Sequence, residues 1–149
     1  MKKLFPLLLF AALCLTFTAC GDGKDEPDAP VQNLVSVHEN DETDMYFVFD
    51  IDMNTEKSTI YMYNIQFAPG APTMTLRVNV PVSLTSGVYT MSGTDLVADM
   101  YMGVAGWIPM QDERDQLKNL MCTVNSKAKE YSISFGAHGG TFEDSGKLK

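Results

Sequence analysis

The stretch "MYFVFDIDM", residues 45–53, alternates apolar side chains with other residues along its whole length. A period of two places every second side chain on the same side of an extended strand. Asp50 and Asp52 fall together on one side. The other side consists of Met45, Phe47, Phe49, Ile51 and Met53. This pattern is typical of an antiparallel strand with one buried face and one face in water.

The same period continues in both directions along the chain and predicts further strands. Alternating apolar positions occur at 74–80, 96–102 and 131–135, and we expect a first strand in "VQNLVSVH" at 31–38. In "STIYMYNIQF" at 58–67, both faces of the expected strand carry apolar or aromatic residues. Tyr61, Tyr63, Ile65 and Phe67 are expected on one face, and Ile60 and Met62 on the opposite face.

Residues that favour turns separate these strands. They lie at 54–57, 68–72, 86–87, 92–95 and 125–129. About eight strands at this short spacing predict an all-β fold, either a single antiparallel β-barrel or a barrel-like sandwich. A closed barrel of about eight strands either fills with side chains or holds one small ligand. Helix is expected only as one short turn in "QDERDQLKN" at 111–119.

The first residues, "MKKLFPLLLFAALCLTFTAC", have the order of parts typical of a secretory signal peptide. Lys2 and Lys3 precede an apolar run, and small residues then lead to Cys20. Thr18, Ala19 and Cys20 resemble the lipobox of bacterial lipoproteins, which implies that Cys20 is lipidated and becomes the new N-terminus. The alternative is an ordinary thiol beside a signal that is cleaved elsewhere. We therefore expect a signal peptide at 1–19 and a lipid anchor at Cys20.

Residues 20–30 are expected to be a flexible acidic tether between the lipid and the folded domain at 31–149, because they are charged, small or proline. Within the tether, Lys24-Asp25-Glu26 is similar to the export signal that sends lipoproteins of the Bacteroidetes to the cell surface. This similarity implies a lipid-anchored protein of the outer membrane, displayed at the cell surface. The alternative is a plain solvated tether.

Charge and cysteine usage narrow the range of partners. The formal net charge is −8, and removal of Lys2 and Lys3 leaves 19 acidic against 9 basic side chains, or about −10. Such a surface repels phosphate backbones, so no nucleic-acid partner is expected. Cys122 would be the only unmodified cysteine of the mature domain, so no internal disulfide is expected, and its apolar neighbours predict a buried side chain.

The lipobox, the tether, the run of alternating strands and "YNIQF" at 63–67 together resemble the calycin-like, lipocalin-type lipoproteins of gut Bacteroidetes. The resemblance implies a β-barrel that binds a ligand. The Gly-x-Trp motif near the start of lipocalins has no counterpart here, because the only tryptophan, Trp107, lies late in the chain. No binding residue is therefore carried over from that family.

Candidate ligand contacts come from "MYMGVAGWIPM" at 100–110, where apolar and aromatic side chains gather around small residues. They are Met100, Tyr101, Met102, Trp107 and Met110. Methionine adapts its shape and aromatic rings stack on apolar or sugar faces, so a site for a small apolar ligand or a glycan is expected. The alternative is a loop that closes one end of the core.

Other kinds of chemistry have weak support in the sequence. Asp50, Asp52 and Asn54 have the spacing of the first ligands of a calcium loop, but Thr55 and Tyr61 replace its required Gly and Glu. His38 and His138 are too few for a zinc site, so surface positions are expected for both. We expect no cofactor and no catalysis, although a carboxylate pair for glycoside hydrolysis stays open. The second functional hypothesis is a structural, adhesion or envelope-complex subunit with a solid core.

Overall fold

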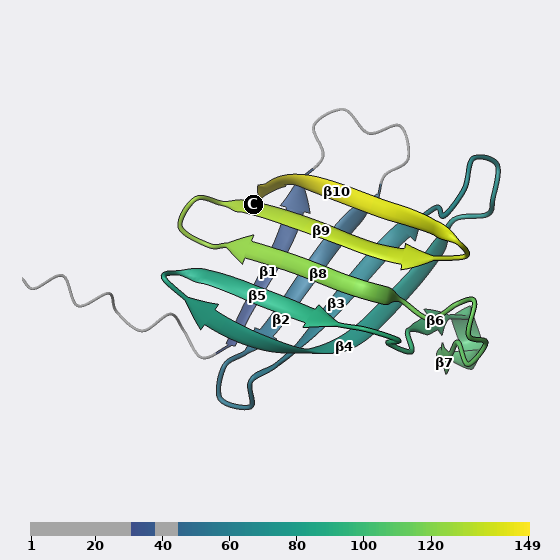
Figure 1. Cartoon of the computed structure of the whole chain (residues 1–149), viewed down its shortest axis with the longest axis horizontal. Helices are drawn as coiled ribbons and strands as arrows, with labels where there is room; N and C mark the ends of the chain where they lie inside the picture. The colour runs from purple at the N-terminus through teal and green to yellow at the C-terminus, as the bar shows by residue number, and fades with distance from the viewer. Residues whose placement is uncertain (1–30, 38–44) are drawn as a thin grey trace, which may run out of the picture.

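The alternating segments form strands in the computed structural model, which describes residues 31–37 and 45–149. Figure 1 shows these strands in chain order. They are β1 (Val31–Val37), β2 (Tyr46–Asp52), β3 (Lys57–Ile65), β4 (Met74–Thr85), β5 (Val88–Gly93), β6 (Asp99–Tyr101), β7 (Trp107–Pro109), β8 (Lys118–Asn125), β9 (Glu130–Ala137) and β10 (Gly140–Leu148). The described part contains no α-helix and one 3-10 turn, Gly103–Ala105.

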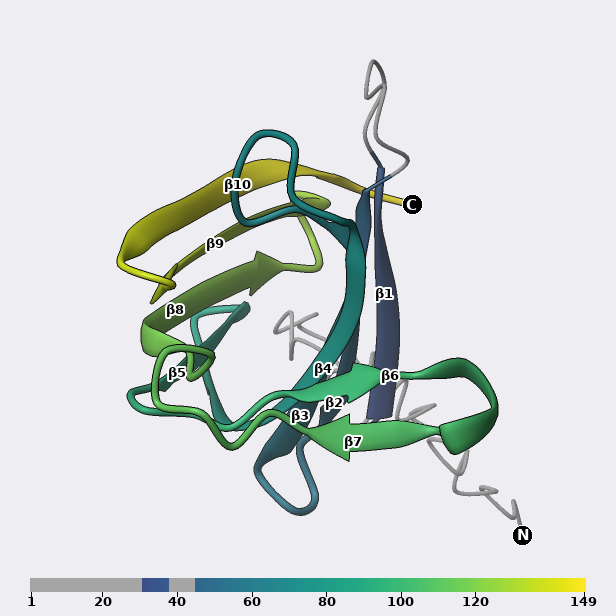
Figure 2. The same cartoon turned by 90° about the vertical axis from the view of Figure 1, so that its right-hand side faces the viewer.

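Eight of the described strands close into an antiparallel barrel in the order β1-β2-β3-β4-β5-β8-β9-β10. The circle closes where Ser36 and Val37 of β1 pair with Leu148 and Lys147 of β10. The expected all-β barrel is therefore confirmed. Two extra strands, β6 and β7, form a hairpin that is attached to the first half of β4. Figure 2 shows this hairpin extending past the barrel strands.

The inward faces of the strands fill the barrel with side chains. Phe47, Phe49 and Ile51 of β2 have no exposed surface, which confirms the alternation in "MYFVFDIDM". Aromatic rings pack against one another across the interior: Phe47 lies 5.6 Å from Tyr131 and Phe135 lies 4.9 Å from Phe142, measured between ring centroids. Each such side chain contributes roughly 1.5–3 kcal/mol through its burial.

The faces of β3 follow the expected alternation as far as Tyr63 and differ from it at Ile65. Tyr61 and Tyr63 point outward, whereas Ile60 and Met62 are buried inside the barrel. The pairing with β4 shifts between Met62 and Ile65, which marks a β-bulge. The extra residue of a bulge turns the next side chain to the other face, so Ile65 is also buried. The prediction that Ile65 shares a face with the two tyrosines was wrong for this reason.

The two ends of the barrel have different connections. Tight turns join β2 to β3, β4 to β5, and β8 to β9 at one end, and longer segments at 66–73 and 94–117 lie at the other (Figure 1). The one short turn expected at 111–119 forms at residues 113–115, but it is not helical. Loops on a rigid scaffold are a common place for binding residues.

Candidate functional site

Five aromatic side chains form a continuous row on the outside of the barrel, here named the outer aromatic strip. Its members are Tyr46 of β2, Tyr63 and Tyr61 of β3, Trp107 of β7 and Tyr101 of β6. The centroids of the Tyr46 and Tyr63 rings are 4.4 Å apart and the rings are nearly parallel. The other successive centroid distances are 6.4 Å for Tyr63–Tyr61, 6.0 Å for Tyr61–Trp107 and 5.3 Å for Trp107–Tyr101. The last three distances are within the range of favourable ring contacts, and the Tyr46–Tyr63 distance lies at its lower limit.

Strand register produces this row. Tyr46 pairs directly with Tyr63, and Tyr101 pairs with Trp107. Side chains of directly paired residues lie on the same face of a sheet. The inward positions next to them hold Phe47 and Met62, so the rings must point away from the core. The strip is thus a consequence of four strands meeting on one wall.

Arg77 of β4 holds the tryptophan in place. Its Nε donates a hydrogen bond of 2.8 Å to Asp99 Oδ2, and its Cζ lies 4.7 Å from the centre of the Trp107 ring. This distance is within the range of a cation–π interaction. Asp99 neutralises the guanidinium locally, and both side chains are half-buried. The result is a fixed and locally neutral ring face.

The hydroxyl group of Tyr63, in the middle of the strip, holds its proton more firmly than an ordinary tyrosine does. Desolvation raises the pKa of Tyr63 above its ordinary value, and the neighbouring Tyr46 and Tyr61 raise it further. A protonated phenol can donate one hydrogen bond and accept others. The strip therefore offers apolar ring faces together with polar edges.

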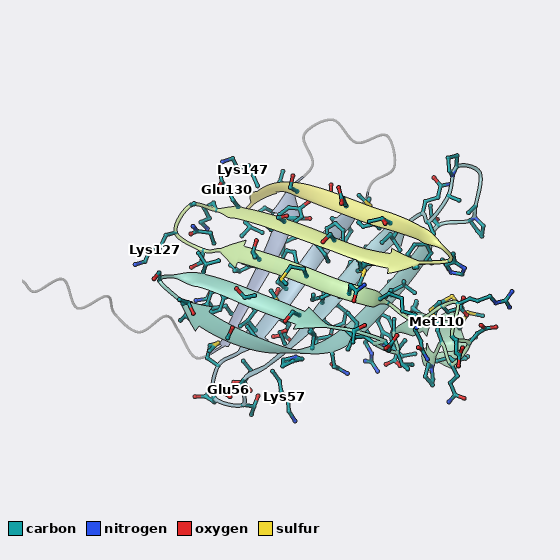
Figure 3. The ribbon with its side chains drawn as sticks, viewed as in Figure 1. Glu56, Lys57, Met110, Lys127, Glu130 and Lys147 are labelled. Carbon is teal, nitrogen blue, oxygen red and sulfur yellow. The ribbon has the colours of Figure 1, made fainter. Side chains whose placement is uncertain are left out.

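The structure places the five predicted contact residues in three different settings. Trp107 and Tyr101 belong to the outer aromatic strip, whereas Met100 and Met110 are half-buried against the core. Met102 is exposed in the segment between the two short strands. Figure 3 shows Met110 beside the β6–β7 hairpin, at the end opposite the β2–β3 turn. Sequence reasoning did not find the contributions of Tyr46, Tyr61, Tyr63 and Arg77.

A polar trough lies beside the strip on the same outer wall, near the β2–β3 turn. It has a volume of about 660 Å³, and Asp50, Thr59 and Asn79 lie side by side in it. The Thr59 hydroxyl donates to Asn79 Oδ1 at 2.9 Å. Thr59 and Tyr61 are two residues apart on β3 and therefore share a face. The trough and the strip form one continuous surface.

Asp52 has a structural role in the turn. Its carboxylate accepts hydrogen bonds from the Thr55 hydroxyl and from the Asn54 amide, both at 2.9 Å. These hydrogen bonds lower the pKa of Asp52, and the bond from the Thr55 hydroxyl has the largest effect. Among the described residues, no group of three or more His, Cys, Asp or Glu side chains is arranged to hold a metal ion.

A second hollow, here named the mouth pocket, lies at the loop end of the barrel and has a volume of about 540 Å³. It opens between the β3–β4 loop and the β9–β10 turn. Its walls are formed by Phe67, Ala68, Ala71, Pro72, Met74, Ala137, His138, Gly139 and Gly140. His138 is exposed, as expected, and its Nε2 lies 3.3 Å from Asp115 Oδ1.

Cys122 is fully buried and forms no disulfide, which confirms its expected place in the core. Desolvation raises the pKa of its thiol. A buried and protonated thiol is a poor nucleophile. The predicted signal peptide, Cys20, the tether and His38 lie outside the described residues.

In the part of the chain that the structure describes, no helix is long and apolar enough to span a membrane. Comparisons with models of protein families, with curated proteins and with solved structures found no match. Function therefore has to be inferred from the geometry of this chain itself.

Proposed function

We propose that the protein is a non-catalytic lipoprotein that binds a glycan through the outer aromatic strip. The observation that carries this proposal is the unbroken row of five rings across one wall. Pyranose rings have apolar faces of C–H groups, and these stack on aromatic rings. A row of rings offers several sugar units successive stacking surfaces, and each buried aromatic face contributes through the area it removes from water.

The polar trough supports the same function. Hydroxyl groups of a sugar can donate to Asp50 and exchange hydrogen bonds with Asn79, both of which line this hollow beside the rings. Among the described residues, the Asp50 carboxylate has no ion-pair partner, so its oxygens can accept from a ligand. The formal net charge of −8 disfavours acidic polysaccharides. We therefore expect an uncharged glycan.

The filled interior favours the outer wall over a ligand inside the barrel. Phe47, Phe49 and Tyr89 occupy the space that a ligand would need. Of the two ligand classes expected from the sequence, the glycan fits the outer aromatic strip better than a small apolar molecule does. A half-exposed row of rings edged by polar side chains suits an amphipathic ligand.

The test uses Trp107, because it is the only tryptophan and its fluorescence reports on the strip. Titration with a panel of neutral oligosaccharides should change this fluorescence in a saturable way. Trp107→Ala should weaken retention on the same glycans by at least about tenfold, as expected for a central aromatic contact. Met121→Ala is the matched control, because Met121 is an exposed apolar residue of β8. Failure of the unmodified protein to bind any neutral glycan would overturn the proposal.

The proposal includes a lipid at Cys20 and display at the outer membrane, with residues 20–30 as the tether to β1. Two or three acyl chains would hold such a domain at a membrane almost permanently. Cys20→Ala should move the protein from the membrane fraction to the supernatant of cells. Unchanged membrane retention would show that another feature attaches it.

A second function, protein interaction, is favoured by the β6–β7 hairpin. Val104 is fully exposed, and Met102 and Ile108 are each nearly half exposed. Within the described strands, β7 pairs only with β6, so its other edge is open. Exposed apolar groups beside an open edge are typical of contact surfaces. Val104→Asp should then abolish binding to a protein partner and leave glycan binding unchanged, whereas Trp107→Ala should weaken glycan binding.

A further inference from the structure

We propose that the mouth pocket binds a small, uncharged and mainly apolar molecule, independently of the outer aromatic strip. The pocket lies at the loop end of the barrel, and barrel mouths are preferred places for small ligands. Its volume of about 540 Å³ is within the range of such sites. Two rigid walls support the proposal, and so does a lining that is apolar except for His138.

The first wall is the loop between β3 and β4. Ala68, Pro69, Gly70 and Ala71 form a tight turn, in which the Ala71 amide donates to the Ala68 carbonyl at 3.0 Å. Proline at the second position and glycine with φ of 81° at the third are the preferred residues of a type II turn. The side chain of Gln66 also donates to the Ala71 carbonyl. These bonds fix the wall before any ligand arrives.

The second wall is the turn between β9 and β10. His138 and Gly139 have φ angles of 51° and 76°, which are typical of a type I′ hairpin turn. The His138 amide donates to the Arg114 carbonyl at 3.0 Å, and the ring of His138 lies near Asp115. The long loop at 111–117 therefore supports this turn from outside. This second wall is held by contacts of both the main chain and the side chain of His138.

The floor of the pocket is anchored in the core. Phe67 meets Phe135 edge to face at 6.1 Å between centroids, and Phe135 is buried. The Phe67 ring also lies 5.2 Å from the His138 ring. Phe67 thus connects the two walls, and together with Met74 and Ala137 it supplies an apolar surface. A preformed apolar floor loses little conformational freedom when a ligand binds.

The lining selects against charged ligands. His138 is the single ionisable side chain among the residues that form the walls, and Asp115 is its partner. The next charged groups, Asp112 and Arg114, are paired with each other at 2.8 Å. A charged ligand would lose hydration here without gaining an ionic partner. An uncharged molecule of one or two rings meets the lining without that cost.

The experiment is a nuclear magnetic resonance titration of the purified protein with indole as the uncharged probe. Saturable shifts are expected at the amides of Ala71, Gly139 and Gly140, with the Trp107 ring signal unchanged. Indole-3-acetate, a charged probe of similar shape, should bind at least fivefold more weakly. No saturable shift, shifts centred on Trp107, or equal affinity for the charged probe would each overturn the proposal.

Variants separate the pocket from the rest of the surface. Ala71→Leu fills the hollow and should weaken indole binding at least fivefold. Ala68→Leu fills the same hollow and replaces the first variant if that one does not fold. Ala128→Leu is the matched control, because Ala128 is exposed in the β8–β9 turn at the other end. Indole binding that is unchanged in a folded filling variant would overturn the assignment. Glycan binding should stay unchanged in both filling variants, so the proposals for the mouth pocket and for the outer aromatic strip are tested separately.

Discussion

The guanidinium carbon of Arg77 lies 4.7 Å from the centre of the Trp107 ring, while the Arg77 Nε donates to Asp99. The two residues come from different strands, β4 and β7, so this contact fixes the β6–β7 hairpin against the barrel wall. Tyr61 adds a second contact to the same tryptophan at 6.0 Å between centroids. Trp107 is therefore fixed from two sides.

Arg77→Ala should loosen the tryptophan and weaken glycan binding. An exposed cation–π contact contributes about 0.5–1 kcal/mol, which corresponds to roughly two- to fivefold in affinity. The fluorescence of Trp107 should shift to longer wavelength, because its ring gains contact with water. Arg77→Lys tests the planar stacking separately and should give an intermediate loss. Unchanged fluorescence in Arg77→Ala would contradict the positioning role of this residue.

Two adjacent residues of β2 should differ strongly in their contribution to stability. Phe47 is completely buried, whereas Tyr46 points outward into the strip. Phe47→Ala should lower the free energy of unfolding by about 3–5 kcal/mol. Tyr46→Ala should lower it by about 0.5–1.5 kcal/mol, through loss of the stacked pair with Tyr63. Chemical denaturation of both variants measures the difference, and equal losses would contradict the alternation.

Local alternation made most of the barrel predictable from sequence. Phe47, Leu76 and Ile133 are all buried as their period of two requires. The bulge in β3 was not predictable, because Asn64 takes a positive φ of 55° that the sequence does not require. A single inserted residue reverses the faces that follow it. Alternation therefore placed Tyr61 and Tyr63 correctly on one face, opposite Ile60 and Met62, but it could not place Ile65.

The candidate site was only partly predictable, because it depends on long-range pairing. Trp107 and Tyr101 lie close in sequence, so "MYMGVAGWIPM" was sufficient to nominate them. Their neighbour Tyr61 is far away in sequence and joins them only because β3 and the β6–β7 hairpin flank the same half of β4. The mouth pocket likewise unites residues near 70 with residues near 138. Sequence periodicity contains no information on such pairings.

The thiol of Cys122 should be inert in the folded protein. Its pKa is raised by desolvation, and each unit of increase lowers the thiolate fraction about tenfold. Reaction with a disulfide reagent should therefore be about a hundredfold or more slower in the native state than in denaturant. Cys122→Ser gives the background from any other thiol. Rapid reaction under native conditions would show that this strand opens readily.

The Asp112–Arg114 pair should make stability depend on pH in the acid range. Hydrogen bonds from the Arg114 side chain, and then from its amide, lower the pKa of Asp112 from 3.8 to about 2. The folded protein thus holds this proton less tightly than the unfolded chain does. The stabilisation is fully present above the unfolded pKa of 3.8 and is lost as the pH falls through about 2.

Nuclear magnetic resonance titration of the Asp112 carboxyl should therefore give a midpoint of about 2 in the unmodified protein. Arg114→Ala should move the midpoint up toward 3.8, the ordinary value. In Asp112→Asn, the free energy of unfolding should depend less steeply on pH between about pH 2 and pH 3.8, because the asparagine side chain binds no proton in this range. Arg114 also accepts the hydrogen bond from the His138 amide. Signals of the β9–β10 turn should consequently shift along with the Asp112 titration, and a turn that does not respond would show that this pair does not support the mouth of the barrel.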